Sequence, residues 1–377
     1  MEFCVPCLFG LEGPTADQLR RLGSDNVRAS NGAVRFSGDG TDMARANISL
    51  RCGERVLIEL GSFEVLSFDD LFEAVLRLPW EDFIPRNGSF PVKGHSLNSK
   101  LFSVPACQSI IKKAVAERLK KTYKLSVFPE DGALFRIQFM IMKDTATLYL
   151  DTSGAGLHKR GYRPAHVNAP LRETLAAALV SFAKYRGKGS FADPFCGSGT
   201  IAIEAALAAL NRAPGINRSF SAEDWGCFEK RIWSDVREEA AAAEYSGSYE
   251  ISAGDIDPKA TELARANAKR AGTGSVIRFE TADALKRIRE TDIDVIVTNP
   301  PYGERMLEKE RARELCRAIG EACRDKSDSD IYILSCEPDF ERLFGAGATK
   351  RRKLYNGMIK CALYMYLRRF EKGAGAP

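Results

Sequence analysis

The residues with the clearest chemical potential are Asn299-Pro300-Pro301-Tyr302, which stand directly after a short apolar segment. That segment, Ile293 to Val297, is rich in β-branched residues and predicts a buried parallel strand. The two prolines end the strand, because proline has no N–H to donate to a sheet and its ring fixes φ. An amide, a fixed carbonyl and an aromatic ring therefore follow the carboxyl end of a strand, where open α/β sheets bind ligands.

This set of groups predicts the alkylation of an amine that is attached to a flat ring. Such an amine is a poor nucleophile, since its lone pair is delocalised into the ring. Two acceptors, the Asn299 side-chain oxygen and the Pro300 carbonyl, match its two N–H donors and would favour a pyramidal, nucleophilic nitrogen. Tyr302 would stack on the face of the base. The alternative is an ordinary Pro-Pro turn after a strand, because short motifs also occur by chance.

A second motif combines an acidic residue with a glycine-rich turn. A strand is predicted to end at Asp193, and a tight turn then leads to Thr200 and an alanine-rich helix. The glycines allow a ligand to approach the backbone closely, and the helix N-terminus supplies free N–H groups. Since Gly197-x-Gly199-x-x-Ala202 also fits the dinucleotide fingerprint, this loop alone leaves a nicotinamide oxidoreductase open.

Acidic residues also follow the next two predicted strands. Asp255 and Asp257 suit the hydroxyls of a ribose, and Asp283, with Ala284 after it, suits an adenine amine. The residues predicted to bind a cofactor are Asp193, Phe195, Cys196, Gly197, Ser198, Gly199, Thr200, Asp255, Asp257, Asp283, Ala284 and Asn299. The residues predicted to act in catalysis are Asn299, Pro300, Pro301 and Tyr302.

The four strand ends, taken in this order, resemble those of class I S-adenosylmethionine-dependent methyltransferases that modify exocyclic amines. Residues 350–354 and 358–367 predict a terminal antiparallel pair, which that fold has and a dinucleotide domain lacks. The resemblance implies a Rossmann-like α/β domain with a mixed seven-stranded sheet and S-adenosylmethionine as cofactor. A cysteine-nucleophile base methylase is excluded, because Tyr302 stands where such enzymes carry Pro-Cys and Cys196 lies on the glycine-rich turn.

The first 64 residues predict the order β-α-β-β-α-β of a ferredoxin-like α+β domain. Asn31-Gly32 is typical of a type I′ hairpin turn, and Thr41 is the expected cap of the helix that follows. These residues contain no catalytic constellation.

Residues 65–155 combine a loop rich in serine and lysine, at 93–103, with a long helix that Pro105 opens and that has a basic face. A charge run is usually a solvated face, but this combination also suits a phosphate backbone. The pattern resembles a THUMP domain, an RNA-binding module. The residues predicted to contact RNA are Lys93, Lys100, Lys112, Lys113, Lys120, Lys121, Lys159, Arg160 and Arg163.

The segments LHKRGYR, APLRETLAAAL, DPFCGSGTIAIEAA, GDIDP and TNPPYGERM, with a hairpin near the C-terminus, resemble the YpsC/RlmL-type family of THUMP-containing RNA methyltransferases. The expected organisation is a ferredoxin-like domain (1–64), a THUMP domain (65–155), a basic linker (156–170) and a methyltransferase domain (171–377). The family implies N2-methylation of a guanosine in 23S ribosomal RNA. Transfer RNA as substrate, adenine N6 as acceptor, and a ribosome-assembly factor with an inactive enzyme core remain open.

Composition adds few constraints. A net charge of +5 is compatible with a nucleic-acid partner, and the ten cysteines and three histidines show no metal-ligand spacing, so no metal is expected. We see no signal peptide and no apolar run long enough to cross a membrane, and we expect a cytoplasmic protein. The oligomeric state is not predictable from this sequence.

Overall fold

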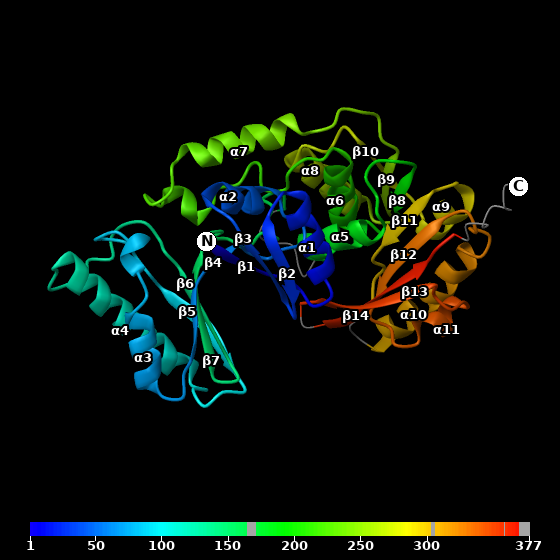
Figure 1. Cartoon of the computed structure of the whole chain (residues 1–377). Coiled ribbons are helices and arrows are strands. Elements are labelled where there is room, and N and C mark those ends of the chain that lie inside the picture. The colour runs from blue at the N-terminus through cyan, green and yellow to red at the C-terminus, as the bar shows by residue number, and fades with distance from the viewer. Residues whose placement is uncertain (164–170, 303–305, 358, 369–377) are drawn as a thin grey trace, which may run out of the picture. The chain divides into compact units, whose positions relative to one another are not determined.

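The structure, a computed structural model, describes residues 1–163, 171–302, 306–357 and 359–368. It divides into two compact units, whose helices and strands are labelled in Figure 1. The N-terminal unit comprises Met1–Cys7, Thr15–Leu157 and Gly215–Ala240. The C-terminal unit comprises Leu8–Pro14, His158–Pro214 and Ala241–Pro377.

The N-terminal unit is built on one seven-stranded sheet with the order β2-β3-β1-β4-β7-β6-β5. Its strands are β1 (Glu2–Pro6), β2 (Asp25–Ser30), β3 (Ala33–Ser37), β4 (Leu57–Glu64), β5 (Val92–Leu97), β6 (Ile137–Met142) and β7 (Thr145–Asp151). Its helices are α1 (Glu12–Arg21, from Thr15 on), α2 (Gly40–Ser49), α3 (Phe68–Leu76) and α4 (Val104–Tyr123). Because β4 pairs with β7, the expected ferredoxin-like and THUMP domains share a continuous sheet, and the boundary at residue 64 stays a prediction.

Two local predictions for this unit are wrong. The cap of α2 is Asp39, whose side chain accepts from the Thr41 and Asp42 amides at 2.7 and 3.1 Å, so Thr41 is not the cap. A carboxylate two residues earlier is an equally good cap, and the sequence offers both. The expected loop after residue 92 begins as strand β5, because parallel pairing with β6 satisfies its backbone from Val92 to Leu97.

The irregular segment 215–240 groups with the N-terminal unit, although it lies within the predicted methyltransferase domain. Trp225 is buried there, stacks on Phe135 at 4.7 Å between ring centroids and donates its indole N–H to the Leu134 carbonyl at 2.9 Å. Most of α7 (Arg231–Ala242) follows on this segment, with Trp233 and Val236 buried. Segment 215–240, which lies far along the sequence, therefore contributes to the packing of the N-terminal unit.

The C-terminal unit contains the predicted mixed seven-stranded sheet, with the order β10-β9-β8-β11-β12-β14-β13. Five strands are parallel: β8 (Phe191–Asp193), β9 (Ile251–Asp255), β10 (Ile277–Thr281), β11 (Val295–Thr298) and β12 (Asp330–Ser335). The antiparallel pair is β13 (Lys350–Asn356) and β14 (Ile359–Tyr366). The helices are α5 (Glu173–Phe182), α6 (Thr200–Ala209), α8 (Pro258–Ala271), α9 (Ala284–Glu290), α10 (Met306–Ala322) and α11 (Phe340–Phe344).

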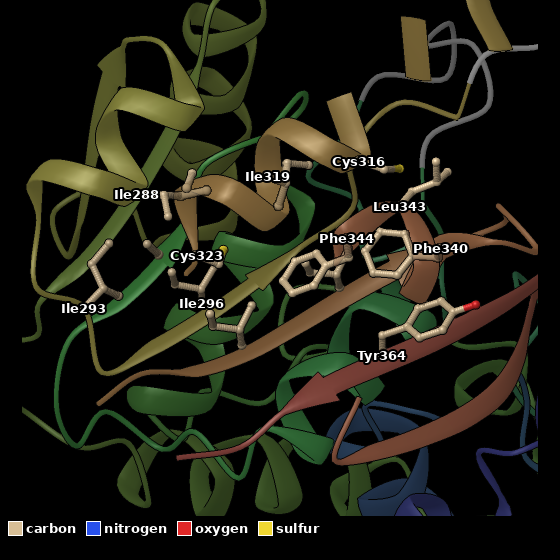
Figure 2. Packing of buried hydrophobic residues seen from close by; sticks show 14 residues of the cluster. Ile288, Ile293, Ile296, Cys316, Ile319, Cys323, Phe340, Leu343, Phe344 and Tyr364 are labelled. Atoms are coloured by element: carbon tan, nitrogen blue, oxygen red, sulfur yellow. The ribbon is translucent and has the colours of Figure 1, made fainter. Parts of the chain in front are cut away.

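An apolar cluster holds β11 and β12 against α10 and α11 (Figure 2). Ile296 contributes from β11 and Ile319 from α10, and both are about 1% exposed. The Phe340 ring stacks on Tyr364 at 4.5 Å between centroids, which joins α11 to β14. Burial of aromatic and branched side chains on this face fixes the strand whose end carries Asn299.

Gly320 of α10 lies against the backbone of Phe344, the last residue of α11. A Cβ atom at this position would overlap the Phe344 carbonyl oxygen, which is backbone and cannot rotate away. We predict that Gly320→Ala lowers the free energy of unfolding by about 1–3 kcal/mol, as overpacking does in other cores, despite the better helix propensity of alanine. Gly347→Ala is the control, since a Cβ there meets nothing within 4 Å. Equal urea-unfolding midpoints for both variants and the wild type would contradict the prediction.

Candidate active site

The ends of two neighbouring parallel strands meet at the centre of the C-terminal unit. Strands β8 and β11 pair in the register Val295↔Phe191 and Ile296↔Ala192, so Asp193 and Thr298 end side by side. The Thr298 hydroxyl donates to Asp193 Oδ1 at 2.9 Å, and each of these residues is only 1% exposed. This buried hydrogen bond joins the strand before the glycine loop (residues 194–200) to the strand before the Asn-Pro-Pro-Tyr turn (residues 299–302).

A cavity of about 480 Å³ lies at these strand ends, within the size range of ligand pockets. Among the residues that the sequence singled out, the structure brings together Asp193, Phe195, Cys196, Gly197, Ser198, Thr200, Asp257, Asn299 and Tyr302. The cavity is also lined by residues that sequence reasoning missed: Leu171, Ile201, Lys259, Ala260, Leu263 and Asn356. Asn356 stands between the two strands predicted at 350–354 and 358–367, where a turn is expected, but nothing in the sequence placed that turn at the pocket.

Two polar atoms at the cavity have no hydrogen-bond partner among the described residues. They are Asn299 Oδ1 and the Tyr302 hydroxyl, and both are buried. Buried polar atoms in folded proteins are nearly always paired, so such atoms beside a cavity are suited to a ligand. Burial raises the pKa of Tyr302, which therefore keeps its phenolic proton. Pro300 is buried and Pro301 exposed, and neither lines the cavity.

The two predicted ribose acids have different surroundings. Asp255 accepts from the Gly197 amide through Oδ2 at 2.9 Å and from the Asp257 amide through Oδ1 at 3.0 Å, and it does not line the cavity. Asp257 does line the cavity and caps α8 by accepting from the Lys259 amide at 2.9 Å. Asp255 therefore shapes the glycine loop, while Asp257 is the acid that a ligand can reach.

The predicted adenine acid lies outside this cavity. Asp283 is exposed and caps α9 by accepting from the Lys286 amide at 2.9 Å, and Ala284 is 8% exposed. Neither residue lines the 480 Å³ cavity, so their role in cofactor binding stays a prediction.

Gly199, another residue predicted to bind the cofactor, does not line the cavity either. It has φ of +82° and lies so close to α8 that an added Cβ would be 2.9 Å from the Ala264 Cβ.

Burial changes the acid–base behaviour of two groups at the cavity. Desolvation, and secondarily the Asp255 charge, raises the pKa of Asp193 to about 7, against the opposing hydrogen bonds from Thr298 and the Phe195 backbone. Burial also raises the pKa of Cys196, so its thiol stays protonated at neutral pH and is a poor nucleophile. A buried carboxylate with a raised pKa is suited to a cationic ligand, which would restore its ionised form.

No group of three or more His, Cys, Asp or Glu side chains capable of holding a metal occurs among the described residues. In the same part of the chain, no helix combines the length and the apolar character that crossing a membrane requires.

The basic residues predicted to contact RNA fall into two groups. Lys93, Lys100, Lys113, Lys121 and Lys159 are exposed, and Lys120 is half-buried. Lys112 is also half-buried, donates to the Phe90 carbonyl at 3.2 Å and forms an ion pair with Glu130, so its ammonium already has acceptors.

The prediction that Arg160 contacts RNA is wrong. Its side chain is only 2% exposed and pairs at 3.2 Å with Glu204, which is fully buried and also accepts from the Tyr162 hydroxyl at 3.3 Å. Arg163 is likewise directed into the unit, where it forms an ion pair with Glu173 and donates to the Leu171 carbonyl at 3.1 Å. A charge that is buried and paired in this way is not available to a phosphate backbone.

Three family models match the chain. An RMKL-like methyltransferase domain matches residues 160–365, a THUMP domain matches residues 66–151, and an RlmL ferredoxin-like domain matches residues 2–57. The first of these models covers more than half of the chain. The family predicted from the motifs is therefore confirmed.

Individual proteins agree with these matches. A putative RNA methyltransferase YpsC from Bacillus subtilis is 43% identical over 360 residues, covering 95% of this chain and 93% of the relative. A ribosomal RNA large subunit methyltransferase K/L from Psychromonas ingrahamii is 32% identical and covers 97% of this chain, which spans only 50% of that relative. SMU.472, a putative methyltransferase with a crystal structure complexed with SAH, is 36% identical in sequence to this chain. The two structures superpose with a TM-score of 0.92, covering 98% of this chain and 99% of SMU.472. The chain therefore belongs to the RMKL-like family of THUMP-containing, S-adenosylmethionine-dependent RNA methyltransferases.

Proposed function

We propose that the protein methylates the 2-amino group of a guanosine in 23S ribosomal RNA. The observation that carries the proposal is the buried, unpartnered Asn299 Oδ1 at the cavity, which offers an acceptor to an amine. The resemblance to the YpsC/RlmL-type family favours guanine N2. The relatives whose names specify large-subunit ribosomal RNA are about twice as long as this chain, so their substrate is part of the proposal.

The cavity residues fit S-adenosylmethionine, which when bound supplies a methyl group on a positively charged sulfur. The glycine loop would lie along the cofactor, because the space around Gly197 is open: a Cβ there would meet nothing within 4 Å. Asp257 would accept from the ribose hydroxyls, and the buried Asp193 carboxylate would attract positive charge. Asp193, Gly197 and Asp257 all line the cavity, which supports these assignments.

At the target base, Asn299 would act as the central catalytic residue. Its Oδ1 and the Pro300 carbonyl would each accept one N–H of the amine, which turns the nitrogen lone pair toward the methyl group. Tyr302 would stack on a base that has left the RNA helix, as aromatic residues do in enzymes that act on flipped bases. Correct orientation of reacting groups contributes up to ~7–11 kcal/mol to such reactions.

No obligatory general base is needed in this scheme. The methyl donor is a cationic sulfur, so it leaves as a neutral group and requires no proton. The nitrogen becomes acidic only after it has gained the methyl group, and water can then accept its proton. Neither the protonated Tyr302 nor the protonated Cys196 is suited to act as a base at neutral pH.

The N-terminal unit would supply affinity for RNA through its exposed lysines. Phosphate contacts of this kind give strength and position without reading sequence. A substrate that is ribosomal RNA also supports a cytoplasmic location, which we propose on that ground.

Nucleoside analysis tests the reaction directly. The enzyme is incubated with isotopically labelled S-adenosylmethionine and unmodified 23S ribosomal RNA, and the digested product is identified by mass spectrometry. Labelled N2-methylguanosine supports the proposal. Labelled N6-methyladenosine, or label confined to transfer RNA offered in parallel, would replace it with one of the two alternatives.

For the catalytic residue, we predict that Asn299→Ala lowers the single-turnover rate by about 10²-fold or more, the scale seen when one preorganised polar contact is lost. The affinity for S-adenosylmethionine should change little, because the side chain would face the base. Tyr302→Phe should remain active, while Tyr302→Ala should lose the stacking contribution of about 1–3 kcal/mol. A Tyr302→Phe enzyme as inactive as Tyr302→Ala would show that the hydroxyl, and not the ring, is required.

The pKa of Asp193 predicts a pH dependence of cofactor affinity. Below about pH 7 the carboxyl of the free protein is protonated and no longer attracts a cation, so the Kd for S-adenosylmethionine should rise as pH falls from 8 to 6. Asp193→Asn should bind weakly and show a flatter profile, because its amide does not titrate. Calorimetry at three pH values measures both profiles, and a wild-type Kd that stays constant across this range would rule out the assignment.

Charge reversal tests the RNA surface. Replacing Lys93, Lys100, Lys113 and Lys121 by glutamate should weaken RNA binding about tenfold or more and reduce its salt dependence, since each lost phosphate contact lowers the slope. Reversal at four lysines that are exposed in the C-terminal unit, Lys184, Lys188, Lys286 and Lys309, is the control with the same change in net charge. If both sets have the same effect, the N-terminal lysines have no special role.

A further inference from the structure

A hydrogen-bond network connects the glycine loop to the segment that precedes residue 164. Asn267 of α8 is fully buried and donates from Nδ2 to the Ser198 carbonyl at 2.8 Å. The Asn267 Oδ1 accepts a hydrogen bond from Arg270 Nη2 at 2.5 Å. Arg270 in turn donates from Nε to the Tyr162 carbonyl at 2.7 Å. Asn267, Arg270 and Tyr162 do not line the cavity, whereas Ser198 does.

The chemistry of the partners fixes the orientation of the Asn267 amide. A guanidinium can only donate, so it requires the amide oxygen, and a backbone carbonyl can only accept, so it requires the amide NH2. The amide therefore satisfies both neighbours in one orientation only. Aspartate has nearly the same shape but would present an oxygen to the Ser198 carbonyl.

Tyr162, at the end of this network, is itself held in place by burial and a hydrogen bond. It is 3% exposed, and its hydroxyl donates to Glu204, which also binds Arg160. The next residue, Arg163, donates to Thr200 Oγ1 at 3.5 Å, and the Ser198 and Thr200 hydroxyls are 3.1 Å apart. The glycine loop is thus held from two sides, through Asn267 at its backbone and through Arg163 at its end.

We propose that Asn267 and Arg270 are positioning residues that keep the glycine loop in the shape that binds S-adenosylmethionine. Asn267 acts on the loop through the Ser198 carbonyl, and Arg270 acts through Asn267. The inference uses only cofactor binding, so it does not depend on which base accepts the methyl group.

The test is the affinity of the full chain for S-adenosylmethionine, measured by calorimetry. Asn267→Asp should raise the Kd about tenfold, since it exchanges a hydrogen bond in a buried site for a repulsion between oxygens. Arg270→Ala should raise the Kd by a smaller factor. The matched control is Arg265→Ala. Arg265 is also an exposed arginine of α8, but it donates to the Phe279 carbonyl and has no part in the Asn267 network.

Further measurements separate positioning from a general loss of stability. Amide hydrogen exchange of residues 194–200 in the cofactor-free protein should be faster in Asn267→Asp and Arg270→Ala and unchanged in Arg265→Ala. The KM for RNA should stay near the wild-type value. In the double variant, the two effects should be less than additive, because Arg270 acts through Asn267.

Three results would overturn the proposal. They are a wild-type Kd in Asn267→Asp, equal effects of Arg270→Ala and Arg265→Ala, and loop exchange that does not change. If Asn267→Asp does not fold, the comparison of the two arginine variants still decides, because both are surface substitutions with the same change in charge.

Discussion

The candidate site depends on the buried hydrogen bond between the Thr298 hydroxyl and Asp193 Oδ1. It lies between β8 and β11, where the strand order of the sheet changes direction. Open α/β sheets bind ligands at this kind of switch point, because the connections on either side diverge and leave a crevice. Here the hydrogen bond also fixes the distance between the residues after β8, which line the cavity, and the Asn-Pro-Pro-Tyr turn after β11. A donor and an acceptor of a methyl group must be aligned closely, and this contact sets the frame in which that alignment occurs.

Strand β11 and the glycine loop after β8 are held in place by different kinds of interaction. Under β11 the support is apolar, from the cluster that joins β12, β14, α10 and α11. Around the glycine loop it is polar and charged, from Asp255, Asn267, Arg163 and the buried pair of Arg160 with Glu204. Apolar packing is insensitive to direction, whereas hydrogen bonds define the orientation of individual backbone groups. A loop that must present its backbone to a ligand requires the second kind of support.

The sequence predicted the elements that have local signals. The Asn31-Gly32 hairpin, the helix that Pro105 opens, the glycine loop and the terminal antiparallel pair all depend on residue types within a short window. Predictions failed where distant contacts decide. Arg160 was assigned to RNA because the segment around it is basic, and no local pattern showed that Glu204, 44 residues later, would neutralise it. The same limit explains why Asn356 and Asn267 were missed and why the sequence did not show that segment 215–240 packs with the N-terminal unit.

The proposed acceptor of the methyl group is the 2-amino group of a guanosine that binds at Asn299. Once the modified position is known, the most direct test uses an RNA in which that guanosine is replaced by inosine, which differs only by lacking the 2-amino group. We expect no transfer of label from S-adenosylmethionine to this RNA, with an RNA affinity close to that of the natural sequence. Methyl transfer to the inosine at a rate near that for guanosine would show that the 2-amino group is not the acceptor.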